Sequence, residues 1–235
     1  MIQNIIDNYI REERAKRDEE RKDKEEAFYF SSIGYCQRRQ YLTRLGVYPD
    51  MIDDRLRRVF AVGNIFEDWV VTILENKFER FELFVYFDTQ GLITTEGWRG
   101  RYDMLLKDYE GFHLYEIKTK HSRFFHNNYE PDVHYEMQLA AYKEFIDKEI
   151  TDCRILYISK DDLILKEVGV NTDKHRENVL ETIVSLNKSW KEKKIPDCTC
   201  GKFCKWELNK KYRPDPDVCQ MTEDELQEFI SKNKK

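Results

Sequence analysis

The order of predicted elements along this chain indicates an α/β domain built around a mixed β-sheet. Helical periodicity near the N-terminus gives way to a series of short apolar strands, then to a helix, two further strands and a last helix. Strands interleaved with helices in this way are typical of a sheet whose faces are covered by helices. The chain has 235 residues, of which 40% are hydrophobic and 14% aromatic, enough for one substantial core.

The first predicted helix is followed by a long charged run. Every residue from Arg11 to Glu26 except Ala15 is charged, with seven positive and eight negative side chains. A run of mixed sign is typical of an exposed helix. We therefore assign no catalytic role to it.

Two more helices are expected before the strands. One lies within 28–46, with Ser31 or Ser32 as its N-cap. The other covers roughly 54–81 and is expected to break near Gly63, because glycine is a weak helix former.

The remainder alternates strands with helices. The predicted strands cover 83–88, 91–95, 98–107, 112–119, 153–159 and 162–168, and the predicted helices cover 132–147 and 173–193. Pro196 ends the last helix, and a cysteine-rich tail follows. We divide the chain into a helical N-terminal region (1–60), a core (61–195) and a C-terminal cysteine module (196–235).

Charge and hydropathy restrict the class of protein. The formal net charge of −5 argues against a protein that coats nucleic acid by bulk electrostatics. No apolar run approaches the ~20 residues that a membrane span needs, and no cleavable signal sequence is recognised. We therefore expect an intracellular, cytoplasmic protein.

Two acidic strand positions are the strongest functional signal. Asp103 ends one apolar run, and Glu116 and Lys118 lie in the next, with a short turn between the runs. Alternate residues of a strand share a face, so Glu116 and Lys118 point to the same side, and a hairpin can bring Asp103 there. Two carboxylates beside an ammonium can hold a divalent cation and prepare a water for attack on a phosphodiester. The alternative is a set of solvent-facing strand side chains.

Side chains before and after this pair fit the same site. Glu67 lies in a helical pattern and offers a third carboxylate, although a surface helix carboxylate is the simpler interpretation. Gln138 and Tyr142 are four residues apart, so they share one helix face. They could contact a nucleotide, or they could pack a helix on the sheet.

Together these segments resemble the RecB-like branch of the PD-(D/E)XK nuclease superfamily. The ordered matches are Gly63 with Glu67, Gly100 with Asp103, Glu116 with Lys118, and Gln138 with Tyr142. Glu67 stands where many members have His. The resemblance implies a restriction-endonuclease-like core with a central mixed sheet.

The resemblance also implies roles for these residues. Asp103, Glu116 and the Ile117 carbonyl would bind Mg²⁺ or Mn²⁺, and Glu67 would complete the metal shell directly or through water. Lys118 would orient or activate the water and offset charge on the phosphorane. The remaining two residues, Gln138 and Tyr142, would position the strand being cut.

Six cysteines in an intracellular chain indicate metal or redox chemistry rather than disulfides. Cys198, Cys200 and Cys204 form a tight cluster, whereas Cys36 lies far upstream. By ligand type alone, zinc and an iron–sulfur cluster both fit. Cys153 begins a strand and is interpreted as a small core residue.

One subset of RecB-like nucleases has one cysteine before the nuclease motifs and three after them, which jointly bind a 4Fe–4S cluster. It includes CRISPR-associated Cas-four-type exonucleases, AddB and many phage exonucleases. The resemblance implies such a cluster on Cys36, Cys198, Cys200 and Cys204, with Cys219 as a rival ligand. The cluster would join the N-terminal helical region to the C-terminal tail.

The hypothesis is therefore a metal-dependent DNA exonuclease that acts on single strands or DNA ends. Its setting would be phage recombination or repair, or CRISPR spacer acquisition, with protein partners from those systems. The alternatives are a non-catalytic DNA-binding or assembly module on the same fold, and a zinc-stapled restriction-like endonuclease.

Overall fold

The computed structural model describes residues 2–22, 27–46, 53–77, 86–125, 130–198 and 221–233. The chain forms two compact units. The terminal unit contains Met1–Phe28, Tyr35–Val59 and Glu181–Lys235, and the sheet unit contains Tyr29–Gly34 and Phe60–Leu180. No helix among the described residues combines the length and the apolar character needed to cross a membrane.

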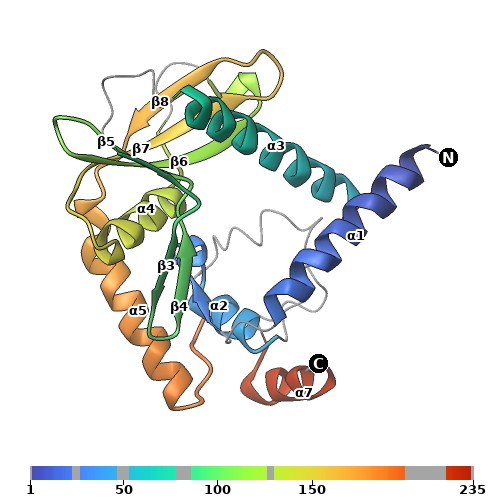
Figure 1. Ribbon diagram of the computed structural model, residues 1–235. Coiled ribbons are helices and arrows are strands. Elements are labelled where there is room, and N and C mark those ends of the chain that lie inside the picture. Colours follow the sequence, from blue (N-terminus) through green and yellow to red (C-terminus); the bar gives the residue numbers. More distant parts are fainter. Residues whose placement is uncertain are drawn as a thin grey trace. The chain divides into compact units, whose positions relative to one another are not determined.

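The sheet unit is built on a five-stranded mixed sheet, as predicted (Figure 1). Its strands follow the order β2-β5-β6-β7-β8. Their bounds are β2 Tyr86–Thr89, β5 Met104–Lys107, β6 Phe112–Lys120, β7 Ile150–Ser159 and β8 Leu165–Gly169. The central pair β6 and β7 is parallel, and the other pairs are antiparallel. A crossover through α4 (Val133–Phe145) connects the parallel pair, as parallel strands require.

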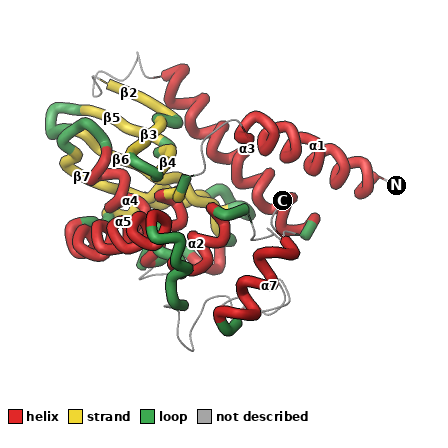
Figure 2. Tube along the Cα trace, turned by 90° about the horizontal axis from the view of Figure 1, so that it is seen from below, coloured by secondary structure: helices red, strands yellow, loops and turns green. Residues whose placement is uncertain are grey.

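A second sheet has the order β1-β4-β3. Its strands are β1 Phe28–Tyr29, β3 Leu92–Thr95 and β4 Trp98–Arg101. The predicted single strand over 98–107 is therefore wrong, because β4 and β5 belong to different sheets. The chain changes sheets at Tyr102 and Asp103, where the Tyr102 N–H donates to the Gly91 carbonyl at 3.1 Å. Figure 2 shows β2, β5, β6 and β7 following one another in the larger sheet.

Helix α3 (Asp54–Lys77) passes through Gly63 without a break, so the predicted interruption is wrong. One glycine costs a helix about 1 kcal/mol, which the packing of the surrounding turns offsets. Phe66, Val70 and Leu74 of this helix pack on the sheet face formed by Met104, Leu106, Tyr115 and Ile117. The face of β6 that carries Tyr115 and Ile117 is thus core, which leaves Glu116 and Lys118 on the opposite face.

The terminal unit is helical. It contains α1 (Ile2–Lys22), α2 (Gln37–Arg44), most of α5 (Arg176–Lys191) and α7 (Glu223–Asn233). The prediction that Ser31 or Ser32 caps a helix is wrong: both end a short 3₁₀ turn, and α2 begins after Cys36. The physical reason is Phe30, which is fully buried and stacks on Trp98 at 5.5 Å, so the chain stays folded into the sheet unit there.

Helix α7 was not expected from the sequence. Its first turn is a capping box, in which the Thr222 N–H donates to Glu225 Oε2 at 2.8 Å and the Glu225 N–H donates to Thr222 Oγ1 at 3.4 Å. Leu226 is buried against Leu42 of α2. The tail therefore contributes a helix to the core of the terminal unit.

Candidate active site

Glu116 is the centre of the predicted site. It lies in the middle of β6, paired with Ile155 of β7, and its side chain is only 2% exposed. Its Oε1 accepts hydrogen bonds from the Lys118 ammonium and from Gln138 Nε2, the latter at 2.8 Å. Its Oε2 is buried and has no hydrogen-bond partner among the described residues. A buried carboxylate oxygen without a partner is costly unless a ligand satisfies it.

Asp103 lies beside this carboxylate. It occupies the junction before β5 and is 8% exposed, and its Oδ2 accepts the backbone N–H of Ile117 at 2.6 Å. Antiparallel pairing of β5 with β6 places Met104 opposite Tyr115, which brings Asp103 next to Glu116. The change of sheet at Asp103 thus turns its carboxylate toward the strand that carries Glu116.

Burial raises the pKa values of both buried carboxyls of the site. Burial raises the pKa of Glu116 to about 8, and the charge of Asp103 adds to this effect. Burial likewise raises the pKa of Asp103. Burial opposes a charged Lys118, but the charges of Glu116 and Asp103 outweigh it, so the pKa of Lys118 lies above its ordinary value.

Glu67 of α3 is the third carboxylate. Its pKa is raised to about 7, first by burial and then by the charge of Asp103. Its Oε1 accepts a hydrogen bond from Gln90 Nε2. The carboxylate oxygens of Glu67, Asp103 and Glu116 are not all within 4.8 Å of one another. Among the described residues, one other group of acidic and histidine side chains has its ligand atoms that close together.

Gln138 and Tyr142 both lie on the face of α4 that packs on the sheet. They are 5% and 1% exposed, and Gln138 Nε2 also donates to the Tyr142 hydroxyl at 3.0 Å. The Tyr142 ring explains the glycine of the Gly100–Asp103 pair, since a Cβ on Gly100 would lie 2.5 Å from Tyr142 Cε1. Packing therefore connects two motifs that are 42 positions apart in the sequence.

Ile117 was predicted to offer its carbonyl to the metal. It is 4% exposed, and its side chain lies in the core on the other face of β6. Its N–H is the group that binds Asp103. The structure thus brings together all six predicted catalytic side chains and Ile117 within the sheet unit.

Two residues near this site were missed by sequence reasoning. Gln90 binds Glu67 from the turn between β2 and β3. Tyr135 lies in the first turn of α4, and the Lys118 ammonium is 5.1 Å from the centre of its ring. Neither belongs to a repeated spacing, so only the tertiary fold reveals them.

The predicted metal cysteines lie partly outside the described residues. Cys36 Sγ and Cys198 Sγ are 3.9 Å apart in the terminal unit, with Cys36 buried. Next to them, Arg38 Nε donates to the Pro196 carbonyl at 2.9 Å, which joins the start of α2 to the C-terminal segment. Cys200, Cys204 and the rival Cys219 lie outside the described residues. Cys153 is buried, and burial raises the pKa of its thiol to about 11, as befits a core residue.

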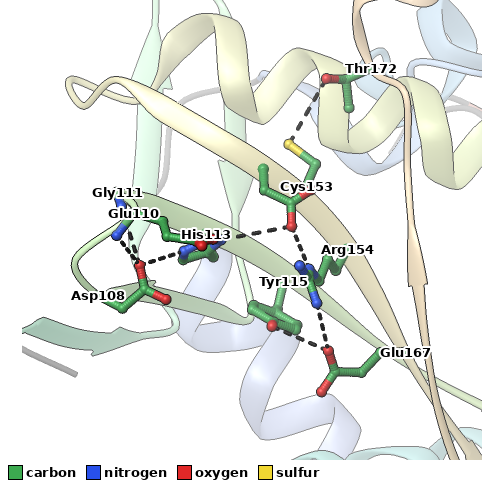
Figure 3. A network of polar contacts seen from close by, with 10 residues as sticks. Asp108, Glu110, Gly111, His113, Tyr115, Cys153, Arg154, Glu167 and Thr172 are labelled. Carbon is green, nitrogen blue, oxygen red and sulfur yellow. Dashed lines mark hydrogen bonds and ion pairs between the residues drawn. The ribbon is translucent and has the colours of Figure 1, made fainter. Parts of the chain in front are cut away.

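One group of acidic and histidine side chains lies apart from the predicted site. Among the described residues, Asp108, Glu110 and His113 have their ligand atoms within 4.8 Å of one another. Asp108 and Glu110 lie in the turn between β5 and β6, and His113 is the second residue of β6 (Figure 3). Asp108 Oδ1 already accepts the N–H groups of Glu110 and Gly111, at 2.7 and 3.2 Å, and lies 2.9 Å from His113 Nε2. Asp108 Oδ1 thus has hydrogen-bond partners within the protein and needs no metal ion to satisfy it.

Comparisons with known proteins define the fold only. No family model and no curated protein sequence matches the chain. Among solved structures, the protein SSO0001 is similar with a TM-score of 0.50 and 19% identity, over 79% of this chain and 88% of that one. At this identity the likeness concerns the fold alone, a mixed sheet flanked by helices.

An alkaline exonuclease from Laribacter hongkongensis gives a TM-score of 0.43 with 15% identity, over 72% of this chain and 91% of that one. The structure of that enzyme in complex with dAMP gives 0.46 and 16%, over the same shares. Both scores are too low to support an argument about activity. These comparisons therefore assign no activity to this chain.

Proposed function

We propose that this chain is a divalent-metal-dependent deoxyribonuclease that hydrolyses phosphodiester bonds of single strands or of DNA ends. One observation carries the proposal: Glu116 is buried beside a second buried carboxylate and an ammonium, and its Oε2 has no partner in the described part of the chain. Packing alone gives no reason to bury two carboxylates together, because neighbouring like charges in a buried site repel each other. A cation between them would remove that cost.

The donor set fits Mg²⁺ or Mn²⁺. Carboxylate and carbonyl oxygens are the ligands that these hard cations prefer. Asp103, Glu116 and the Ile117 carbonyl would hold the ion. Glu67 would complete the metal shell directly or through water. When bound, the ion polarises the phosphate and lowers the pKa of a water, which supplies the nucleophile.

The protein's own side chains would then do three things. Lys118, held against Glu116, would orient the attacking water and offset the charge that develops on the phosphorane. Gln138 is buried and donates to Glu116, so its role in this proposal is to orient that carboxylate, with Tyr142 behind it. Tyr135, whose ring lies at the Lys118 ammonium, offers a surface on which a base can stack.

The resemblance to RecB-like nucleases supports DNA as the substrate. It also supports a setting in phage recombination or repair, or in CRISPR spacer acquisition, in the cytoplasm. A non-catalytic DNA-binding or assembly module on the same fold is the rival from another class.

The deciding experiment is digestion of end-labelled single- and double-stranded DNA with Mg²⁺ or Mn²⁺. The wild-type protein should shorten the labelled DNA strands from an end. Asp103→Asn should abolish cleavage and retain DNA binding in a gel-shift assay. Asp108→Asn is the matched control, because it removes a carboxylate from the other end of the same hairpin. If the wild type binds DNA and cuts nothing with either metal, the non-catalytic module is the correct interpretation.

We further propose that the cysteines hold a 4Fe–4S cluster, with Cys200 and Cys204 completing the pair Cys36 and Cys198. The adjacency of that pair supports a shared metal group. Two thiolates at about 2.3 Å on one tetrahedral zinc would be ~3.8 Å apart, so zinc is the specific rival. Protein purified without oxygen should be brown, absorb near ~400 nm and contain about four iron atoms per chain. A colourless preparation with one zinc per chain would replace the cluster by zinc.

A further inference from the structure

The turn between β2 and β3 carries a residue in a costly backbone conformation. Gln90 has a φ of 54°, in the left-handed region that few non-glycine residues adopt. Such a conformation is strained and persists only where surrounding contacts hold it. Residues held in such conformations cluster at functional sites, where neighbouring contacts fix them.

Gln90 contacts two residues of the proposed metal site, one through its backbone and one through its side chain. Its backbone N–H donates to the carbonyl of Asp103 at 3.1 Å. Its side-chain Nε2 donates to Glu67 Oε1. Gly91, the next residue, lies so close to the Tyr102 ring that a Cβ would be 1.9 Å from Tyr102 Cζ. The turn is therefore seated on the junction that carries Asp103, and its amide reaches Glu67 on α3.

The hydrogen bond has a direct consequence for Glu67. The Gln90 amide occupies Glu67 Oε1, which leaves Oε2 as the oxygen that can face the ion or its water. Carboxylates that support a metal commonly depend on such outer partners for their orientation.

We propose that Gln90 is a positioning residue that orients Glu67 toward the divalent cation. This inference rests on the proposed nuclease function. Gln90 contacts neither substrate nor ion in this proposal and acts only through Glu67. The left-handed backbone is what lets one residue bind Asp103 with its main chain and Glu67 with its side chain.

The test compares variants at two left-handed positions. Gln90→Met removes the amide and keeps the length of the side chain, and Gln90→Gly removes the side chain and relieves the backbone. Leu163, with a φ of 58° in the exposed turn between β7 and β8, supplies the matched control Leu163→Gly. Mn²⁺ affinity is measured by titration calorimetry, and cleavage rates are measured against metal concentration.

Both Gln90 variants should weaken Mn²⁺ binding by about tenfold or more, and saturating metal should restore most of the cleavage rate. Leu163→Gly should bind Mn²⁺ as the wild type does. In a Glu67→Ala background, Gln90→Met should have no further effect, because its partner is gone. A role confined to folding of the turn would instead lower the unfolding temperature equally in both backgrounds.

The two hypotheses fail differently. If the wild type binds Mn²⁺ and cleaves DNA, but Gln90→Met matches it in affinity, the positioning role is overturned and the nuclease stands. If the effect of Gln90→Met is the same with and without Glu67, the role through Glu67 is also overturned. If the wild type neither binds Mn²⁺ nor cleaves, both proposals are overturned.

Discussion

The two ends of the β5–β6 hairpin use similar residues in opposite ways. At the turn, Asp108 accepts two backbone N–H groups and lies against His113, whose hydrogen bond is the main reason that the pKa of Asp108 is below its ordinary value. At the other end, burial raises the pKa of Glu116 to about 8, and its Oε2 has no partner among the described residues. A cluster of ligand-type side chains is therefore not by itself a metal site. An unsatisfied, buried carboxylate is the distinguishing feature.

The largest expected effect is on catalysis. Glu116→Gln keeps the shape of the side chain but removes the charge that would hold the cation. We expect cleavage of end-labelled DNA to fall on the order of 10³-fold or more, with the fold retained by circular dichroism. The matched change at the turn, Asp108→Asn, should leave cleavage near the wild-type rate. Equal losses in the two variants would show that the ends of the hairpin do not differ in the proposed way.

The second prediction concerns stability and pH without metal. The pKa of Glu116 is raised from its ordinary 4.5 to about 8, so the folded state holds a proton that the unfolded chain releases earlier. The stabilisation is complete below about pH 4.5 and is lost as the pH rises toward about 8. Urea unfolding in a chelator should show this fall, amounting to a few kcal/mol.

Two comparisons isolate the source of that slope. Glu116→Gln should reduce it, because glutamine does not titrate, and leave the smaller part that comes from the raised pKa values of Glu67 and Asp103. Saturating Mg²⁺ should restore the stability of the wild type near pH 8, because the ion binds the folded carboxylates. A wild-type slope that neither change alters would assign the pH dependence to other groups.

The third prediction tests the packing that supports the site. Gly100→Ala would place a Cβ 2.5 Å from the Tyr142 ring and 2.8 Å from that of Phe30. We expect a destabilisation of about 1–3 kcal/mol in urea unfolding, as for other overpacked positions. Gly63→Ala is the control, since its Cβ would meet only Thr119 Oγ1 at an ordinary 3.6 Å. It should be neutral or stabilising, because alanine favours the helix.

The sequence predicts the mixed sheet and most helices of this molecule, but neither the junction of β4 with β5 nor the unbroken helix at Gly63. Periodicity located the mixed sheet and most helices, since apolar alternation reflects burial directly. It failed at the junction of β4 and β5, because the segment predicted as one strand over 98–107 passes between two sheets. It also predicted a helix break at Gly63. That prediction is wrong because tertiary packing outweighs the low helix propensity of one glycine.

The strand and helix residues of the candidate site could be predicted from the sequence. The residue that the β2–β3 turn contributes could not. Glu116, Lys118, Gln138 and Tyr142 follow fixed spacings, so their convergence could be expected. Gln90 has no such spacing: its contact with Glu67 depends on how the β2–β3 turn is seated on Tyr102. The capping box of α7 is a local signal, since Thr222 and Glu225 are three positions apart in the sequence.

The smallest expected effect is at the turn itself. Asp108→Asn should lower the unfolding temperature slightly, because the neutral amide accepts the backbone N–H groups less strongly than a carboxylate does. The depressed pKa of Asp108 means that its contribution is present near neutral pH and is lost as the pH falls below its ordinary value of 3.8. The difference between variant and wild type should therefore vanish in acid. Mn²⁺ affinity should be unchanged, because the turn satisfies its carboxylate without an ion; a weaker affinity in Asp108→Asn would make the turn a metal ligand and remove the contrast between the two ends of the hairpin.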